Sequence, residues 1–257
     1  MMKKNPIIRV QNLSIGYDDK TVMRDLNFEI AKGDIFVIMG GSGCGKSTLL
    51  RTLTGLIPIQ KGDVFIQDIN LKKADEKQKK EIMKHSGILY QSGALFSSMT
   101  LGENVALPLQ LYSNHNDETI KQIVAFKLAL VGLAGYEDYY PSQISGGMKK
   151  RAGLARALAL DPEIVYFDEP SAGLDPVSSK NLDDLILQIN ENFGTTIIIV
   201  THELPSIFAV AKNAIFLDKS IQTISAQGNP HDLLKNPPNE KVYEFLTRGV
   251  SHEKRTQ

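Results

Sequence analysis

Cysteine is nearly absent from this sequence, since Cys44 is the only one among 257 residues. An intrachain disulfide is therefore excluded, and such cysteine usage is typical of the cytosol. Hydrophobic residues make up 42% of the chain and charged residues 23%, close to the average for globular proteins. We expect a substantial hydrophobic core in one large domain, or in one domain with a subdomain.

The chain also lacks an excess of charge of either sign and has no long apolar runs. Lys+Arg and Asp+Glu both number 29, so the net charge is zero and does not favour nucleic acid as a partner. Apolar runs such as 197–200 suit buried strands and are far shorter than the roughly 18 residues that a membrane span needs. No apolar region follows the lysines at the start, so we expect no signal peptide. If the protein works at a membrane, another chain must cross it.

Short apolar runs predict strands that are buried on both faces of a sheet. These runs lie at 35–39, 164–167, 196–200 and 214–217. Helices are predicted between them at 46–56, 147–159 and 182–189. The last of these helices ends near Gly194. Because strand and helix alternate, we expect an α/β fold with a parallel sheet and right-handed crossovers.

The other segments have weaker patterns. Residues 7–30 predict two short strands around a turn at 17–20, and residues 63–71 predict a further strand. Residues 86–145 predict a mostly helical insertion in the α/β domain, with a helix at 117–133.

Residues 40–48 hold the most specific motif of the chain. Residues 40–47 follow G-x-x-x-x-G-K-[ST], with a buried strand before the motif and a helix after it. The glycines let backbone N–H groups turn toward phosphate oxygens, and Lys46 brings a full charge to the β- and γ-phosphates. The Ser47 hydroxyl suits Mg²⁺, which prefers oxygen ligands. The candidate nucleotide-binding residues are Gly40, Gly41, Ser42, Gly43, Cys44, Gly45, Lys46, Ser47 and Thr48.

Two further strands end in polar residues. The run 164–167 leads into Asp168 and Glu169, and acids at the end of a buried strand are costly unless they meet a cation or water. Asp168 is placed to hold Mg²⁺, and Glu169 can polarise an attacking water. The run 196–200 leads to His202, which we expect at the same sheet edge and in contact with the γ-phosphate.

A second predicted anion site lies at the start of another helix. Ser145 is a good N-cap, and Gly146 and Gly147 expose backbone N–H groups where the helix begins. This pattern is weak by itself, because a plain helix cap has the same residues.

Together these motifs resemble the ABC-type ATPase family. The likeness covers roughly residues 7–228, in the family's order and spacing. The residues that carry it are Tyr17, Gly40 to Thr48, Gln91, Ser145 to Gly147, Asp168, Glu169, Ser171 to Asp175, and His202. The resemblance implies a P-loop NTPase core within residues 5–228, with a mixed or parallel sheet, an N-terminal antiparallel β subdomain and a helical subdomain.

The resemblance also implies roles that the patterns alone leave open. Tyr17 matches the aromatic residue that stacks on adenine, and Gln91 matches the glutamine that contacts Mg²⁺ and the attacking water. Residues 145–147 match the signature that binds the γ-phosphate held by the opposite subunit, and Asp175 ends a loop that crosses the dimer interface. In this family a homodimer closes head-to-tail on two ATP molecules and opens after hydrolysis. A helix N-terminus from the partner then replaces a separate arginine finger.

Residues 144–148 depart from the usual signature L-S-G-G-Q, because Ile144 replaces the leucine and Met148 replaces the glutamine. Met148 removes the polar contact that the glutamine could make. An S-G-G-M signature followed by basic residues is similar to the MlaF-type ATPases, which serve lipid trafficking in Gram-negative envelopes and plastids. The stretch 89–106 and the end of the chain also resemble that branch.

This second resemblance implies a set of partners and a location. The partners are an integral-membrane permease of the MlaE type, an MCE-domain lipid-binding protein and a small STAS-domain protein. The location is the cytoplasmic face of the inner membrane, where the chain binds peripherally. Residues 229–257 are expected to form a tail that packs partly on the partner subunit.

Other functions stay open on the sequence alone. An ABC importer ATPase for a polar solute, such as an amino acid, shares every catalytic motif, and only Met148 and the tail distinguish it. A kinase of another P-loop class has no use for residues 145–147 or for His202. ABC proteins that act on ribosomes or DNA generally carry two cassettes or a long coiled-coil insertion. A non-catalytic nucleotide-binding module would not need the full catalytic set that this chain has.

Overall fold

A computed structural model of the chain describes residues 6–249, and these divide into two compact units. The first unit contains the described residues up to Lys79 together with those from Thr196 onward. The second unit contains Lys80–Thr195, and helix α2 (Glu76–Lys84) includes the boundary at Lys79. The predicted helical insertion therefore lies inside the second unit.

The first unit begins with an antiparallel sheet, as the resemblance implied. Its strands have the order β2-β1-β4-β5 and the bounds β1 (Pro6–Tyr17), β2 (Lys20–Ala31), β4 (Lys61–Ile66) and β5 (Ile69–Asn70). The turn between β1 and β2 lies where the sequence predicts it, but both strands are much longer than expected. The single strand predicted at 63–71 is split in two, because Gln67 and Asp68 adopt left-handed φ angles of 49° and 66° between β4 and β5.

A second, mixed sheet of the first unit positions the phosphate loop. β3 (Ile35–Gly40) is buried at every residue and pairs in parallel with both β8 (Thr196–Val200) and β9 (Asn213–Asp218). β10 (Thr223–Gly228), which the sequence analysis missed, runs antiparallel to β9. Helix α1 (Lys46–Leu53) follows β3 and ends earlier than predicted, because Gly55 takes a left-handed φ of 76°.

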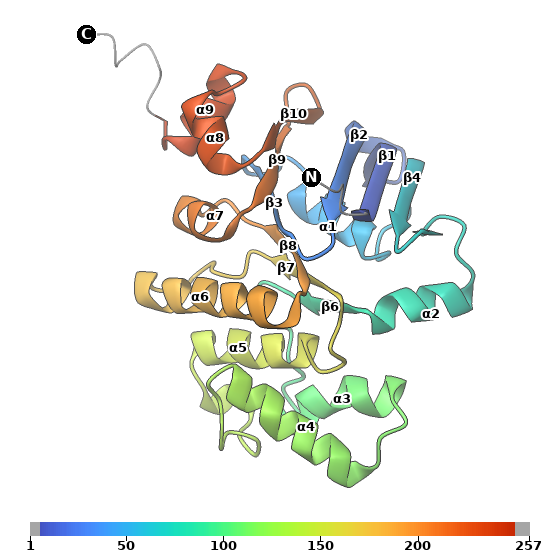
Figure 1. Ribbon diagram of the computed structural model, residues 1–257, viewed down its shortest axis with the longest axis vertical. Helices are drawn as coiled ribbons and strands as arrows, with labels where there is room; N and C mark the ends of the chain where they lie inside the picture. The colour runs from blue at the N-terminus through green and yellow to red at the C-terminus, as the bar shows by residue number, and fades with distance from the viewer. Residues whose placement is uncertain (1–5, 250–257) are drawn as a thin grey trace. The chain divides into compact units, whose positions relative to one another are not determined.

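Three further helices complete the first unit, α7 (Leu204–Val210), α8 (Pro230–Lys235) and α9 (Glu240–Leu246). Helix α8 packs on α7, α9 and β10, and in Figure 1 α8 and α9 lie together beside β9 and β10. Phe245 of α9 meets Phe216 of β9 edge to face, with ring centroids 5.1 Å apart. The described part of the tail is thus ordered on its own chain, while its packing on a partner stays a prediction. Residues 250–257 of the predicted tail lie outside the described residues.

The second unit pairs two parallel strands with a group of helices. Strand β6 (Ser86–Leu89) pairs in parallel with β7 (Ile164–Asp168), so the predicted insertion begins with a strand. The helical elements of this unit are α3 (Leu101–Tyr112), α4 (Asp117–Leu130), the 3-10 helix η1 (Pro141–Gln143), α5 (Gly146–Ala157) and α6 (Pro176–Phe193). Helices α3, α4 and α5 pack against one another (Figure 1).

Local signals set the ends of these helices. Thr100 and Glu103 form a reciprocal capping box at the start of α3, with distances of 3.1 Å and 2.7 Å. Helix α6 ends at Gly194, whose left-handed φ of 65° suits glycine, as the sequence predicted. Within residues 6–249, no helix has both the length and the hydropathy needed to cross a membrane.

The packing of α9 on its own chain generates a first prediction. Leu246 is 3% exposed, so Leu246→Ala should lower the free energy of unfolding by about 2–4 kcal/mol through lost burial and the cavity left behind. Chemical denaturation of the isolated chain measures this loss. Glu244 is exposed on the same helix, so Glu244→Ala should change the free energy by less than about 0.5 kcal/mol. Equal stabilities for the two variants would show that α9 does not pack as described.

Candidate functional site

The predicted site residues are divided between the two units. The first unit carries Tyr17, Gly40 to Thr48, and His202. The second unit carries Gln91, Ser145 to Gly147, Asp168, Glu169 and Asp175. In each unit, several of them lie at the carboxyl end of a pair of parallel strands, which is where ligands bind in α/β sheets.

The phosphate loop runs from the end of β3 to the start of α1. A Cβ atom at Gly40 would lie 2.6 Å from the main-chain oxygen of Leu217, so only glycine fits there. Gly45 has a φ of 98° and is the N-cap of α1, where no side-chain cap is found among the described residues. The N–H groups at the positive end of this helix dipole are therefore suited to bind an anion.

Lys46 is held across this loop by main-chain oxygens. Its ammonium donates to the carbonyl oxygens of Gly40 at 2.9 Å and Gly41 at 3.1 Å, and the residue is buried. A lysine has three N–H donors, so this geometry leaves one for a phosphate oxygen. Because carbonyl oxygens carry no net charge, the positive charge of Lys46 stays available to a phosphate.

Tyr17 lies at the end of β1 beside helix α1. Its hydroxyl is 3.5 Å from Oγ1 of Thr48, yet 47% of the residue remains exposed. A large aromatic surface next to a phosphate-binding loop can stack on a flat ring of a ligand. The placement is therefore compatible with the predicted contact to adenine.

His202 follows β8 at the edge where the phosphate loop begins. Strands β3 and β8 pair in register from Ile35 with Ile197 to Ile38 with Val200, so both strands end on the same side of the sheet. The His202 side chain is 56% exposed, and its Nε2 lies 3.8 Å from Glu203 Oε1. The first unit thus brings His202 and the phosphate loop to one edge of its sheet, while the contact of His202 with a γ-phosphate stays a prediction.

Cys44 is buried inside the phosphate loop at 2% exposure. Burial raises the pKa of its thiol, although the charge of Lys46 opposes this, so the thiol is protonated at neutral pH. A buried neutral thiol fits the role of a small packing group.

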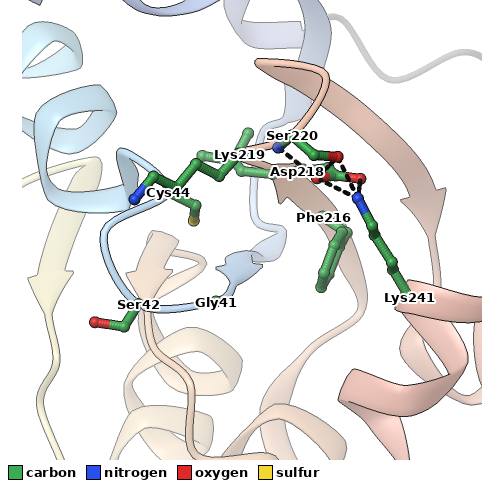
Figure 2. Close-up of a pocket in the computed structure, with 9 residues that line it drawn as sticks. Gly41, Ser42, Cys44, Phe216, Asp218, Lys219, Ser220 and Lys241 are labelled. Atoms are coloured by element: carbon green, nitrogen blue, oxygen red, sulfur yellow. Dashed lines mark hydrogen bonds and ion pairs between the residues drawn. The ribbon is translucent and has the colours of Figure 1, made fainter.

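Figure 2 shows a cavity of about 530 Å³ beside the loop, lined by Gly41, Ser42, Cys44, Phe216, Leu217, Asp218, Lys219, Ser220 and Lys241. There, Lys241 of α9 donates to the Asp218 carboxylate at 3.1 Å and 3.2 Å and also contacts the Ser220 hydroxyl. Helix α9 is therefore tied to the strand that runs beside Gly40.

In the second unit, two strand ends bring polar residues together. Strands β6 and β7 pair in register up to Leu89 with Phe167. Gln91 shortly after β6 and Asp168 at the end of β7 therefore lie at the same edge of the sheet. All five residues of β7 are buried, and Asp168 itself is only 8% exposed. The amide and carboxylate oxygens gathered here are ligand types that Mg²⁺ prefers.

Glu169 adopts a backbone conformation that is rare for its residue type. Its φ of 50° lies in the left-handed region, which costs a residue with a Cβ atom about 1–3 kcal/mol. The following turn is closed by Ala172 N–H donating to Glu169 O at 3.2 Å and by Leu174 N–H donating to Ser171 O at 3.0 Å. Strain of this kind is typical of functional sites.

The predicted signature forms the start of α5. Ser145 caps the helix by accepting a hydrogen bond from the Met148 N–H at 3.3 Å. A Cβ atom at Gly146 would meet no atom within 4 Å, so packing within the chain does not require glycine at that position. The glycine instead leaves the helix N-terminus open to a ligand or a partner.

Asp175 ends the loop that follows Glu169 and caps α6. Its carboxylate accepts from the N–H groups of Val177 and Ser178, both at 3.0 Å. Hydrogen bonds from Ser178 hold the pKa of Asp175 below its ordinary value. Within the chain, the role of Asp175 is therefore to fix where α6 begins.

The sequence analysis missed two basic residues of α5 that hold the neighbouring loops. Arg156 donates to the carbonyl oxygens of Ala94 at 2.8 Å and Gly93 at 3.1 Å, just after Gln91. Lys150 donates to carbonyl oxygens of the loop after Glu169. The available signal was the position of Lys150, one helical turn before the apolar Leu154 on the face that packs inward.

Comparison with known proteins gives matches along most of the chain. The family model described as ABC transporter matches residues 23–172. The probable ribonucleotide transport ATP-binding protein mkl of Mycobacterium tuberculosis is 39% identical over 253 residues, which cover 96% of this chain and 70% of mkl. The intermembrane phospholipid transport system ATP-binding protein MlaF of Haemophilus influenzae is 37% identical over 240 residues, which cover 93% of this chain and 90% of MlaF. The glutamine transport ATP-binding protein GlnQ of Escherichia coli is 37% identical over 242 residues, which cover 93% of this chain and 98% of GlnQ.

A solved structure gives a similar result. The dimeric ATP-binding cassette MJ0796, in a post-hydrolysis state bound to ADP and Pi, matches with a TM-score of 0.79 and 27% identity. The match covers 86% of this chain and 98% of that one. The predicted fold class, an α/β cassette with an antiparallel sheet and a mixed sheet, is confirmed.

The geometry of the phosphate loop predicts how a change at Lys46 affects nucleotide affinity. Lys46→Ala should weaken ATP binding about 10- to 100-fold, because a charge-assisted hydrogen bond to phosphate is lost. Isothermal titration with ATP measures the change. Lys61 is exposed on β4, so Lys61→Ala should keep the affinity of the unchanged chain. An unaltered affinity in the Lys46 variant would contradict the phosphate-loop assignment.

Proposed function

This chain belongs to the ABC transporter family and is an ATP hydrolase, and we propose that it drives phospholipid transport as the nucleotide-binding subunit of a membrane complex. The single observation that best supports the catalytic part is the end of β7. There a fully buried strand delivers Asp168 and a strained Glu169 side by side. Adjacent acids at such a position suit a metal-bound phosphate and a water to be activated.

The proposed roles combine the geometry of each unit with the family resemblance. The N–H groups of the phosphate loop and Lys46 bind the β- and γ-phosphates, and Tyr17 stacks on adenine. Glu169 polarises the attacking water, and His202 contacts the γ-phosphate at the edge where its strand ends. In this scheme the protein mainly orients the reacting groups and stabilises negative charge.

Mg²⁺ suits the kinds of oxygen donor that the proposed ligand residues carry. Ser47, Gln91 and Asp168 offer a hydroxyl, an amide and a carboxylate oxygen, which are hard ligands. Among the described residues, no group of three or more His, Cys, Asp or Glu side chains could hold a metal ion. Mg²⁺ needs only a few protein ligands when phosphates and waters complete its coordination shell. When bound, the ion would neutralise charge on the phosphates.

A homodimer is the proposed working form. The chain carries two anion-binding features, the phosphate loop and the open helix start at residues 145–147. In the proposed head-to-tail dimer, residues 145–147 bind the γ-phosphate of the partner's ATP, and the loop that ends at Asp175 crosses the interface. The dimeric form of the cassette MJ0796 supports this arrangement.

Phospholipid is the proposed cargo because of the signature and one relative. The S-G-G-M signature with Met148 resembles the lipid-transport branch, and MlaF of Haemophilus influenzae is similar over nearly its whole length. The proposed partners are a permease of the MlaE type, an MCE-domain lipid-binding protein and a small STAS-domain protein, with no nucleic acid. The complex would place this chain on the cytoplasmic face of the inner membrane, with part of the tail on the partner subunit.

Polar-solute import is the second candidate function. GlnQ of Escherichia coli, named for glutamine transport, is as similar in identity and coverage as MlaF. The catalytic residues do not discriminate between the two, because both cargoes require the same ATP chemistry. The permease and its partners should therefore decide the cargo.

Replacement of the proposed catalytic base gives a test of the mechanism. Glu169→Gln should bind ATP and stay dimeric while turnover falls about 10²- to 10⁴-fold, because the amide cannot accept the proton. Steady-state phosphate release and light scattering measure the two effects. Glu163 lies just before the other end of β7, so Glu163→Gln should keep turnover. Rapid hydrolysis by the Glu169 variant would rule out its assignment as base.

Purification of the native complex tests the cargo. We expect the chain to co-purify from detergent-solubilised membranes with a permease, an MCE-domain protein and enriched phospholipid. Mass spectrometry identifies the proteins and the lipids. A permease paired with a soluble solute-binding protein, without lipid enrichment, would instead assign the chain to polar-solute import and leave the catalytic roles unchanged.

A further inference from the structure

Lys150 is a buried lysine whose hydrogen-bond partners lie in a catalytic loop. It is on α5, is 7% exposed, and donates to the carbonyl oxygens of Pro170 at 2.8 Å and Ala172 at 2.5 Å. These oxygens lie on either side of Ser171, directly after Glu169. One ammonium therefore holds the turn that follows the proposed base through two hydrogen bonds.

The burial of this ammonium needs an explanation. A buried charge is unfavourable unless its donors are satisfied, and two of the three N–H groups of Lys150 are used on carbonyl oxygens. Burial lowers the pKa of Lys150, and the charge of Glu169 opposes that shift. The charge of Glu169 therefore favours the ammonium form of Lys150.

The turn that Lys150 holds begins with a residue under backbone strain. Glu169 has a φ of 50°, and a left-handed conformation at a residue with a Cβ atom persists only where the surroundings hold it. The bond from Ala172 N–H to Glu169 O closes the turn from within. The bonds from Lys150 hold the same turn from outside, so they help to fix where the carboxylate points.

The same helix begins with the signature at residues 145–147. Lys150 follows Gly147 by three residues, which is less than one turn or roughly 4.5 Å along the axis. A Cβ atom at Gly147 would lie 3.7 Å from Leu174 Cδ2, so the first turn of α5 also packs against the loop after Glu169. A ligand that orders the start of α5 will therefore act on that loop through Lys150.

We propose that Lys150 is a positioning residue, which holds Glu169 in its catalytic orientation and links that orientation to the signature at the start of α5. The inference rests on the proposed function, in which Glu169 is the base and the signature binds the ATP of the partner subunit. In a dimer each signature then influences the base of its own chain while it contacts the nucleotide of the other. The two sites should consequently hydrolyse ATP cooperatively.

The test compares Lys150→Met with Lys150→Arg in the full-length chain. Methionine keeps much of the apolar stem but has no N–H donor and no charge, so kcat should fall about 10- to 100-fold, as misplacement of a catalytic group does. KM for ATP should change less than about threefold, because Lys150 does not belong to the phosphate loop. The Hill coefficient for ATP should fall toward 1, and arginine should restore part of kcat and of the cooperativity.

The control separates positioning from general stability. Lys127 is a second buried lysine of the same unit, 3% exposed, and its ammonium pairs with Asp161 at 2.5 Å. Lys127→Met should cost stability while keeping kcat per bound ATP and the Hill coefficient. Titration with ATP gives the fraction of active sites in each variant. If Lys150→Met does not fold, Lys150→Gln, a neutral side chain with donors, is measured in the same way and should show an intermediate loss of kcat.

Two outcomes would overturn the role of Lys150. One is an unchanged kcat and Hill coefficient in a fully ATP-binding Lys150→Met, or in Lys150→Gln where the methionine variant does not fold. The other is an equal loss of kcat in Lys127→Met. Failure of the proposed function looks different, because the unchanged chain and Glu169→Gln would then hydrolyse ATP at the same rate.

Discussion

A strand that is buried on both faces is unfavourable for charged side chains until it ends, and this constraint locates the chemistry of the chain. Strands β3, β7 and β8 are buried at every residue, and they lead into the phosphate loop, the acid pair and His202. Parallel pairing then aligns neighbouring ends, β3 with β8 in one unit and β6 with β7 in the other. Residues far apart in the sequence therefore reach a common edge of the sheet through the pairing of their strands.

The same strand ends require unusual backbone conformations, for two different reasons. At Gly40 the main-chain oxygen of Leu217 excludes a Cβ atom, so packing alone dictates the residue. At Glu169 the chain keeps a carboxylate in a left-handed conformation although glycine would be less strained. The fold by itself therefore requires glycine at position 40. At position 169, only the proposed chemistry explains why the residue is a glutamate. Bonds within and onto the loop after Glu169 are what keep that conformation in place.

Sequence reasoning predicts the elements with long or chemically specific signals, which include the apolar strands, the phosphate loop and the end of α6 at Gly194. Strands β6 and β10 escape it because neither contains a continuous buried apolar run, although β10 is as long as β3. The predicted strand at 63–71 fails at Gln67 and Asp68, which have left-handed φ angles. Asp68 is a residue type that tolerates this conformation, but Gln67 before it gives no such signal. Lys150 was missed for a related reason. A basic residue on a helix is ordinarily solvated, and only tertiary packing shows that a distant loop accepts its hydrogen bonds.

The partners of the buried lysines separate those that serve structure from those that serve the reaction. Lys127 pairs with the Asp161 carboxylate, so its charge is cancelled within the chain. Lys46 and Lys150 are instead held by main-chain carbonyl oxygens, of the phosphate loop and of the loop after β7. Carbonyl dipoles satisfy N–H donors without removing the net charge. In the proposed mechanism, the positive charge of Lys46 therefore stays available to a phosphate, and that of Lys150 to the Glu169 carboxylate. Because a buried ammonium with carbonyl partners gains little for stability, its presence beside both loops is best explained by the field it supplies to the reaction.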